Sequence, residues 1–166
     1  MLEGRSLPRG ENPMRTLYPA VLLAPISTRD EEAECCALQV RDEQIDFIAS
    51  NAESLEEAAE CPWCEPLAVR AVHSGEMVGF LMHALAPDDN GRWLYRLMID
   101  RHHQGLGYGR AALRALVAYL RGLSGGPDIT LGVAPENIGA RNLYASEGFL
   151  ETGEVLDGEL VMRLRT

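Results

Sequence analysis

Residues 104–110 read QGLGYGR and combine alternate glycines with an arginine and a following helix-like run. The glycines at positions 105, 107 and 109 lose much backbone freedom on folding, so a turn or a ligand must require them. A glycine-rich turn that leads into a helix presents backbone N–H groups to a phosphate. The spacing is not G-x-G-x-x-G, and no G-K-[ST] follows. We therefore expect a phosphate-bearing ligand of another kind.

A second stretch whose residues could take part in catalysis starts at Asn137 and reads NIGARNLYASEGF. Asn137 and Tyr144 lie seven residues apart, which is two helical turns, so both side chains are expected on one face of a helix. On its own, the pattern favours a core aromatic at Tyr144 whose hydroxyl has a partner. Together with the glycine turn upstream, the pattern favours a functional role for Tyr144 instead.

Hydrophobic periodicity and turn residues predict that strands and helices alternate around these two stretches. Ser54 and Glu57 predict the N-cap and capping box of a short helix, and Gly148 predicts the end of a later one. Asp157-Gly158 predicts a hairpin. The expected strands are 20–26, 67–73, 76–85, 92–99, 128–133, 149–156 and 159–164, and the expected helices are 29–39, 42–50, 54–60, 108–122 and 137–147.

This element order, with Q-x-x-G-x-G opening the helix after the fourth strand, resembles the GNAT-type N-acetyltransferases from about Val21 to Arg165. The resemblance implies the acyl-CoA N-acyltransferase fold of the α/β (α+β) class. It implies a mixed, mostly antiparallel sheet of about seven strands with about four helices. It also implies acetyl-CoA as cosubstrate, with no metal.

In this family the pyrophosphate of acetyl-CoA lies on the backbone N–H groups of the glycine turn, where Gly107 and Gly109 would remove Cβ atoms from its path. The asparagine binds the pantetheine arm and the tyrosine hydroxyl faces the CoA sulfur as general acid, which implies these roles for Asn137 and Tyr144. Arg110 either touches the CoA phosphates or belongs to a solvated helix face. The cofactor-binding residues implied are Leu97, Met98, Ile99, Gln104, Gly105, Leu106, Gly107, Tyr108, Gly109, Arg110, Asn137 and Tyr144.

Longer matches resemble the bacterial spermine/spermidine (diamine) acetyltransferases: FIASNA at 47–52, SLEEA at 54–58, RLMID at 96–100 and DGELVM at 157–162. They imply acetyl transfer to a primary amine of a polyamine. Some relatives carry a glutamate base on the fourth strand, but residues 92–99 contain no carboxylate. We therefore expect a water relay to an acid of segment 30–65, with Glu34, Glu53 and Glu56 as unranked candidates.

The net charge of −10 is unevenly distributed along the chain. Residues 30–65 hold twelve acids and one base. The rest of the chain holds thirteen acids and fourteen arginines, so its charge is nearly balanced. The skew disfavours a nucleic-acid partner and suits a cationic one. The resemblance implies that this segment walls the acceptor site. A pair of solvated helices with acidic outer faces would give the same skew.

The 166 residues suit one domain over 17–166, preceded by an aperiodic extension over 1–16 that predicts disorder. No apolar run could span a bilayer and no signal-peptide pattern opens the chain, so we expect a cytoplasmic protein that does not bind membranes. The spacing of Cys35, Cys36, Cys61 and Cys64 does not suit zinc, and His102-His103 lacks a third ligand. A structural or incidental role is expected for the cysteines, and no metal role for the two histidines.

Two other readings stay open from the sequence. One is an acetyltransferase for a protein N-terminus, lysine, aminoglycoside or amino acid. The other is a regulatory module that binds acyl-CoA without turnover, which the missing strand carboxylate favours and Tyr144 opposes. The sequence does not give the oligomeric state, and a homodimer is kept as an option.

Overall fold

The computed structural model describes residues 19–86, 91–123 and 128–165. The predicted extension over 1–16 lies outside the described residues. The elements, in chain order, are β1 (Val21–Pro25), α1 (Arg29–Ala37), the 3-10 helix η1 (Asp42–Phe47), α2 (Asn51–Glu60), β2 (Cys64–Ala71), β3 (Met77–Ala86), β4 (Gly91–Ile99), α3 (Tyr108–Gly122), β5 (Ile129–Val133), α4 (Ile138–Ser146), β6 (Leu150–Leu156) and β7 (Glu159–Leu164).

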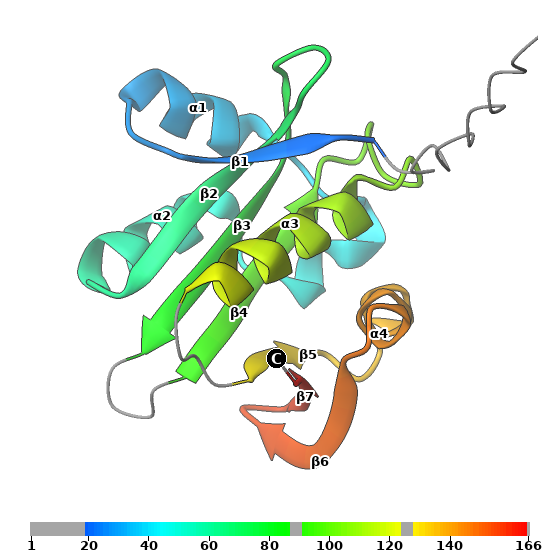
Figure 1. Ribbon diagram of the computed structural model, residues 1–166. Helices are drawn as coiled ribbons and strands as arrows, with labels where there is room; N and C mark the ends of the chain where they lie inside the picture. Colours follow the sequence, from blue (N-terminus) through cyan, green and yellow to red (C-terminus); the bar gives the residue numbers. More distant parts are fainter. Residues whose placement is uncertain (1–18, 87–90, 124–127, 166) are drawn as a thin grey trace, which may run out of the picture.

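One seven-stranded sheet runs through the fold in the order β1-β2-β3-β4-β5-β7-β6 (Figure 1). Every strand pair is antiparallel except β4 with β5, which are parallel. This confirms the predicted mixed, mostly antiparallel sheet. The tight hairpin between β6 and β7 is also confirmed, because Asp157 (φ 50°) and Gly158 (φ 86°) both adopt positive φ.

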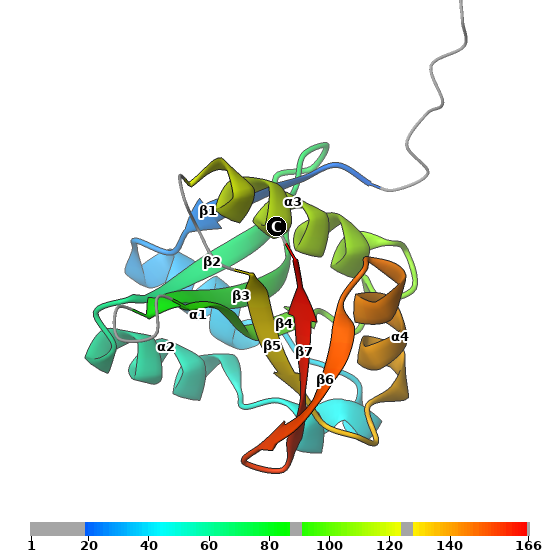
Figure 2. The same cartoon turned by 60° about the horizontal axis from the view of Figure 1, so that its bottom comes forward.

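The helices cover the two faces of the sheet, and each face has its own hydrophobic core. Leu113, Leu116 and Leu120 of α3 pack with Leu131 and Met162 on one face. On the other face, Cys35 of α1 and Leu55 of α2 pack against Phe80. Figures 1 and 2 show α3 and α1–α2 on opposite sides of β2–β4.

The sheet opens between β4 and β5. These strands pair only from Arg92 with Ile129 to Leu94 with Leu131, although both continue beyond that point. Next to the last pair, β4 carries an extra residue: Leu94 lies opposite His83 and Arg96 opposite Met82, so Tyr95 is the bulge residue between them. A bulge of this kind bends the strand and ends its pairing. Figure 2 shows β5, β7 and β6 turning away from β2–β4.

Two predicted helices differ in detail from the structure. The helix expected over 42–50 is a 3-10 helix that ends at Phe47. The predicted cap at Ser54 is wrong: α2 begins one turn earlier, with Ser50 as N-cap and Glu53 completing the capping box. Ser54 is buried within the helix, and its hydroxyl donates to the Ser50 carbonyl. Both serines precede a glutamate at the required spacing, so the pattern alone did not separate them.

Cys61 and Cys64 form a disulfide between the end of α2 and the start of β2. Cys35 is buried in a core and Cys36 is exposed. Among the described residues, no group of three or more His, Cys, Asp or Glu side chains is placed to hold a metal ion. No helix in the described part of the chain combines the length and the apolar character needed to cross a membrane.

Candidate active site

A cavity of about 1080 Å³ lies where β4 and β5 separate. We describe its lining as two walls: the first comes from the glycine turn, the start of α3 and α4, and the other from η1 and the β6–β7 hairpin. Residues 95–99 of β4 and 132–134 at the end of β5 line it from the sheet. Because these segments have no strand partner in the gap, their inner edge can offer backbone hydrogen bonds to a ligand.

The N-terminus of α3 opens on this cavity without a side-chain cap. Thr28, Ser50 and Asn137 accept backbone N–H groups at the starts of α1, α2 and α4, whereas the N-cap of α3 is Gly107, which has no side chain. The first turn of α3 contains no acid either. The uncapped N–H groups and the positive end of the helix dipole together make an anion site.

The glycines of the turn have different reasons to be there. Gly105 (φ 78°) and Gly107 (φ 90°) hold conformations that residues with a side chain rarely adopt. Gly109 is helical, and an added Cβ would lie 3.6 Å from side-chain atoms of Ile99 and Leu143, which is ordinary contact. The expectation that both Gly107 and Gly109 clear a path for phosphate therefore rests on Gly107, since a Cβ at Gly109 would point at neighbouring side chains.

Two polar side chains of the turn have protein partners. Gln104 donates from Nε2 to Gln44 Oε1 (2.7 Å) and to the Ile99 carbonyl (2.9 Å), which ties the turn to η1 and β4. Arg110 donates to Ser146 Oγ (2.9 Å) and pairs with Glu147 (3.1 Å). The Arg110 guanidinium is thus held against α4, at the edge of the cavity that the residue lines.

Helix α4 places Asn137 and Tyr144 on the cavity wall. Asn137 is the N-cap, outside the helix, and its Oδ1 accepts the Ala140 N–H (3.1 Å), so the argument from a shared helix face does not apply to it. Tyr144 is 7% exposed, and within the described part of the chain nothing forms a hydrogen bond with its hydroxyl. Burial and the nearby charge of Glu159 raise the pKa of Tyr144 above its ordinary value, so the phenol keeps its proton.

Carboxylates dominate the opposite wall. Asp46 of η1, Asp157 of the hairpin turn and Glu159 at the start of β7 line the cavity. Arg96 of β4 also lines it, but its guanidinium donates to Glu57 of α2 (2.9 Å). The net charge of this wall is therefore negative, which attracts cations.

Comparisons with known proteins agree with this architecture. The family model described as "Acetyltransferase (GNAT) family" matches residues 29–149. The chain belongs to the GNAT acetyltransferase family. It is 38% identical over 142 residues to "Probable spermine N(1)-acetyltransferase" of Bacillus subtilis subsp. natto (strain BEST195), and 37% identical to "Spermine/spermidine N(1)-acetyltransferase" of Bacillus subtilis (strain 168). Each match covers 81% of this chain and 92% of the relative.

Among solved structures, the spermidine N-acetyltransferase from Vibrio cholerae, in complex with CoA and spermine, matches with a TM-score of 0.68. The identity is 19%, and the match covers 86% of this chain and 92% of that one, so it supports the fold. This GNAT chain is an acetyl-CoA-dependent N-acetyltransferase. The uncapped start of α3, beside a turn whose positive φ angles favour glycine, suits the phosphates of CoA.

Most residues predicted from the sequence of this GNAT domain meet at the cavity. Leu106 and Tyr108 are the exceptions: Leu106 is 60% exposed, and the ring of Tyr108 packs 5.9 Å from that of His103. The predicted residues that line the cavity are Leu97, Met98, Ile99, Gln104, Gly105, Gly107, Gly109, Arg110, Asn137 and Tyr144. Their roles towards acetyl-CoA stay predictions.

The acidic segment 30–65 contributes far less to this GNAT site than its charge suggests. Only Asp46 of its twelve acids lines the cavity. Of the proposed bases, Glu34 pairs with Arg70 (2.7 Å), Glu53 caps α2, and Glu56 is exposed away from the lining residues. Sequence reasoning missed Asp157 and Glu159, although both lie in the quoted DGELVM match, because that stretch indicates only a hairpin.

Proposed function

We propose that this enzyme transfers the acetyl group of acetyl-CoA to a primary amine of a polyamine such as spermidine or spermine. The observation that carries the proposal is the acidic wall, where Asp46, Asp157 and Glu159 line the cavity opposite the start of α3. Its charge suits a flexible polycation and disfavours an anionic acceptor. The names of the Bacillus subtilis relatives point to the same acceptor class.

In the proposed reaction each wall has its own task. The uncapped N–H groups of α3 hold the phosphates of CoA, and the unpaired edge of β4 at residues 97–99 meets the pantetheine and acetyl groups. Tyr144 gives its proton to the departing thiolate. Burial and Glu159 raise the pKa of this phenol, so its proton is still in place when the thiol leaves. The amine nitrogen attacks the thioester carbonyl from the acidic wall.

The test is acceptor-dependent release of free thiol from acetyl-CoA by the purified enzyme. The panel contains spermine, spermidine, putrescine, a monoamine, an aminoglycoside and an amino acid. We expect spermine and spermidine to be the best acceptors, putrescine to be weaker and the monoamine to be poorest. The KM for spermine should rise steeply with salt while that of the monoamine barely changes, because the attraction between exposed charges is screened over about 8 Å at physiological ionic strength.

A better rate with amino acids than with spermidine would contradict the polyamine proposal and leave the acetyltransferase intact. A preference for the aminoglycoside would keep the cationic acceptor and change its class. Binding of acetyl-CoA without thiol release for any acceptor would indicate a regulatory acyl-CoA-binding module.

We also infer that the enzyme works in the cytoplasm as a homodimer and binds neither nucleic acid nor membranes. The net charge of −10 disfavours phosphate-rich partners.

Strand β6 is the edge of the sheet and carries Leu150, Val155 and Leu156, which are 70%, 63% and 53% exposed. An exposed apolar edge strand is a ready surface for a second copy. Sedimentation of wild type and Val155→Asp tests this: a monomeric wild type would contradict it.

A further inference from the structure

The side chain of Glu159 lies directly over Gly132 of β5. A Cβ atom built on Gly132 would collide with Glu159 Oε2 and would lie 3.2 Å from its Cδ. Gly132 has no positive φ, so its backbone conformation does not call for glycine. Glycine at this strand position therefore makes room for the Glu159 carboxylate at the rim of the cavity.

The strand register explains how Glu159 meets Tyr144. Leu131 pairs with Met162, and both belong to the core under α3, so the next pair, Gly132 with Val161, points to the opposite face. Glu159 lies two residues before Val161 and shares that opposite face. Tyr144 reaches the cavity from the α3 side, so the two groups approach from opposite faces through the gap between β4 and β5.

Acetyl transfer to an amine needs a group that removes a proton from the acceptor. An aliphatic ammonium has a pKa near 10.4, so at pH 7 only about one molecule in 2,500 is neutral and able to attack. Residues 92–99 of β4 supply no carboxylate for this task. Glu34, Glu53 and Glu56 do not line the cavity, which leaves the acids of the opposite wall.

We propose that Glu159 is the proton acceptor for the attacking amine, and that Gly132 positions its carboxylate. The ammonium gives one proton to Glu159, and the neutral nitrogen then forms a C–N bond with the thioester carbonyl carbon. The C–S bond breaks, the thiolate takes the Tyr144 proton, and the second amine proton restores that tyrosine. Glu159 is exposed, so it can pass its proton to water. The charge of Glu159 also raises the pKa of Tyr144, which links the two groups electrostatically.

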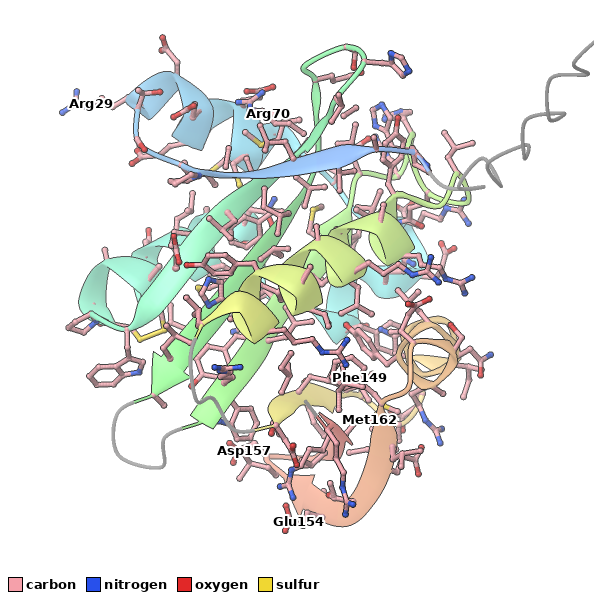
Figure 3. The ribbon with its side chains drawn as sticks, viewed as in Figure 1. Arg29, Arg70, Phe149, Glu154, Asp157 and Met162 are labelled. Atoms are coloured by element: carbon pink, nitrogen blue, oxygen red, sulfur yellow. A yellow bond between two sulfur atoms is a disulfide. The ribbon has the colours of Figure 1, made fainter. Side chains whose placement is uncertain are left out.

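Other acids of the same wall are less suited to this role. Asp157 forms the hairpin turn with φ 50°, and Figure 3 shows it at the hairpin end, with Glu154 on β6. Asp46 belongs to η1, far along the chain from the hairpin, and the glycine that makes room for a carboxylate, Gly132, lies under Glu159. Besides Glu159, the titratable or charged side chains that line the cavity are Asp46, Tyr95, Arg96, His103, Arg110, Tyr144 and Asp157.

The test compares Glu159→Gln with Glu154→Gln, a change on the neighbouring strand that removes the partner of Arg163. We expect Glu159→Gln to lower kcat/KM about 10²–10⁴-fold at pH 7, the usual range for a general base. The deficit should shrink as pH rises, because more acceptor is already neutral. Glu154→Gln should stay within about twofold of wild type at every pH.

Gly132→Ala is the second variant, since it keeps the charge of Glu159 but displaces its carboxylate. It should lower kcat/KM while retaining CoA affinity and a cooperative melting transition. A Glu159→Gln enzyme within threefold of wild type, or a deficit that is constant with pH, would overturn the proposal. The inference rests on the proposed function only for the identity of the amine. If another amine proves to be the acceptor, the same comparison is made with that amine, so the two failures are distinguishable.

Discussion

The two walls of the cavity are built in different ways. The donor wall comes from two compact stretches, the glycine turn with the start of α3 and the N-terminal end of α4 with Tyr144. Its candidate phosphate-binding groups are backbone N–H groups at the start of α3. The acceptor wall gathers side chains from η1, β4 and the hairpin, which are separated by up to 113 residues between Asp46 and Glu159.

The difference shows that acidic composition and acidic location are separate properties. Four of the twelve acids of segment 30–65 cap helices or pair with nearby arginines: Glu31 and Glu53 complete capping boxes, Glu34 binds Arg70, and Glu57 binds Arg96. Figure 3 shows Arg70 beside α1. The hairpin holds fewer acids but directs two of them into the cavity. The number of carboxylates that line the cavity therefore depends more on the register of the hairpin strands than on how many acids a segment contains.

The largest effect should follow from Tyr144→Phe on the donor wall. If the hydroxyl protonates the thiolate, kcat should fall about 10²–10⁴-fold and CoA affinity should barely change. The loss should be the same for every acceptor, because the thiol leaves in each case. Steady-state kinetics with three amines measure this, with Tyr119→Phe as control at an exposed site. A drop below threefold would return Tyr144 to the role of a core aromatic.

Substitutions at Gly107 should show whether glycine is needed there for the backbone conformation or for binding CoA. Gly107→Ala and Gly107→Asn should each weaken CoA binding at least about tenfold, or about 1.4 kcal/mol. Asparagine tolerates positive φ better than alanine, so it should recover stability without recovering affinity.

Gly109→Ala is the matched control for the turn. Its methyl group fits between Ile99 and Leu143, and alanine favours a helix over glycine by about 1 kcal/mol. Calorimetric titration should find CoA affinity within twofold of wild type, and the melting temperature should rise. Normal CoA affinity in a folded Gly107→Asn enzyme would contradict phosphate binding at this turn.

On the acceptor wall, Asp157→Asn should act through charge alone, because asparagine also accepts positive φ. The KM for spermine should rise about two- to fivefold at low salt, the size expected for one exposed charge. Saturating kcat and CoA affinity should remain unchanged. At about 0.5 M salt the difference from wild type should vanish. A larger change in kcat than in KM would assign Asp157 to the chemistry.

A small effect on activity is expected at Asp100, which lies between the end of β4 and the glycine turn. Its carboxylate accepts the N–H groups of Gln39 (2.9 Å) and His102 (3.0 Å). Burial acts to raise the pKa of Asp100, but these hydrogen bonds and the His102 ring outweigh it and lower the pKa. Asp100→Asn should reduce the free energy of unfolding by about 1–2 kcal/mol at pH 7 and change kcat less than threefold.

The direction of the Asp100 pKa shift determines how the stability loss of Asp100→Asn depends on pH. Because folding lowers the pKa of Asp100, its contribution is present above the pKa of the unfolded state and is lost as pH falls through the folded one. Urea denaturation from pH 7 to pH 2 should therefore show the wild type and Asp100→Asn converging in acid. A constant difference over this range would contradict the role of the charge.

The sequence by itself determined the donor wall and the order of elements. The glycine turn and the Asp157-Gly158 hairpin depend on local backbone conformation, so short stretches specify them. The shared helix face expected for Asn137 and Tyr144 was wrong, because Asn137 lies outside the helix as its N-cap. Tertiary structure decided the acceptor wall. The bulge at Tyr95 separates β4 from β5, and the register of β7 turns Glu159 over Gly132 towards the resulting gap. Neither relation is visible along the chain, because a shift of one residue would move Glu159 to the other face of the sheet.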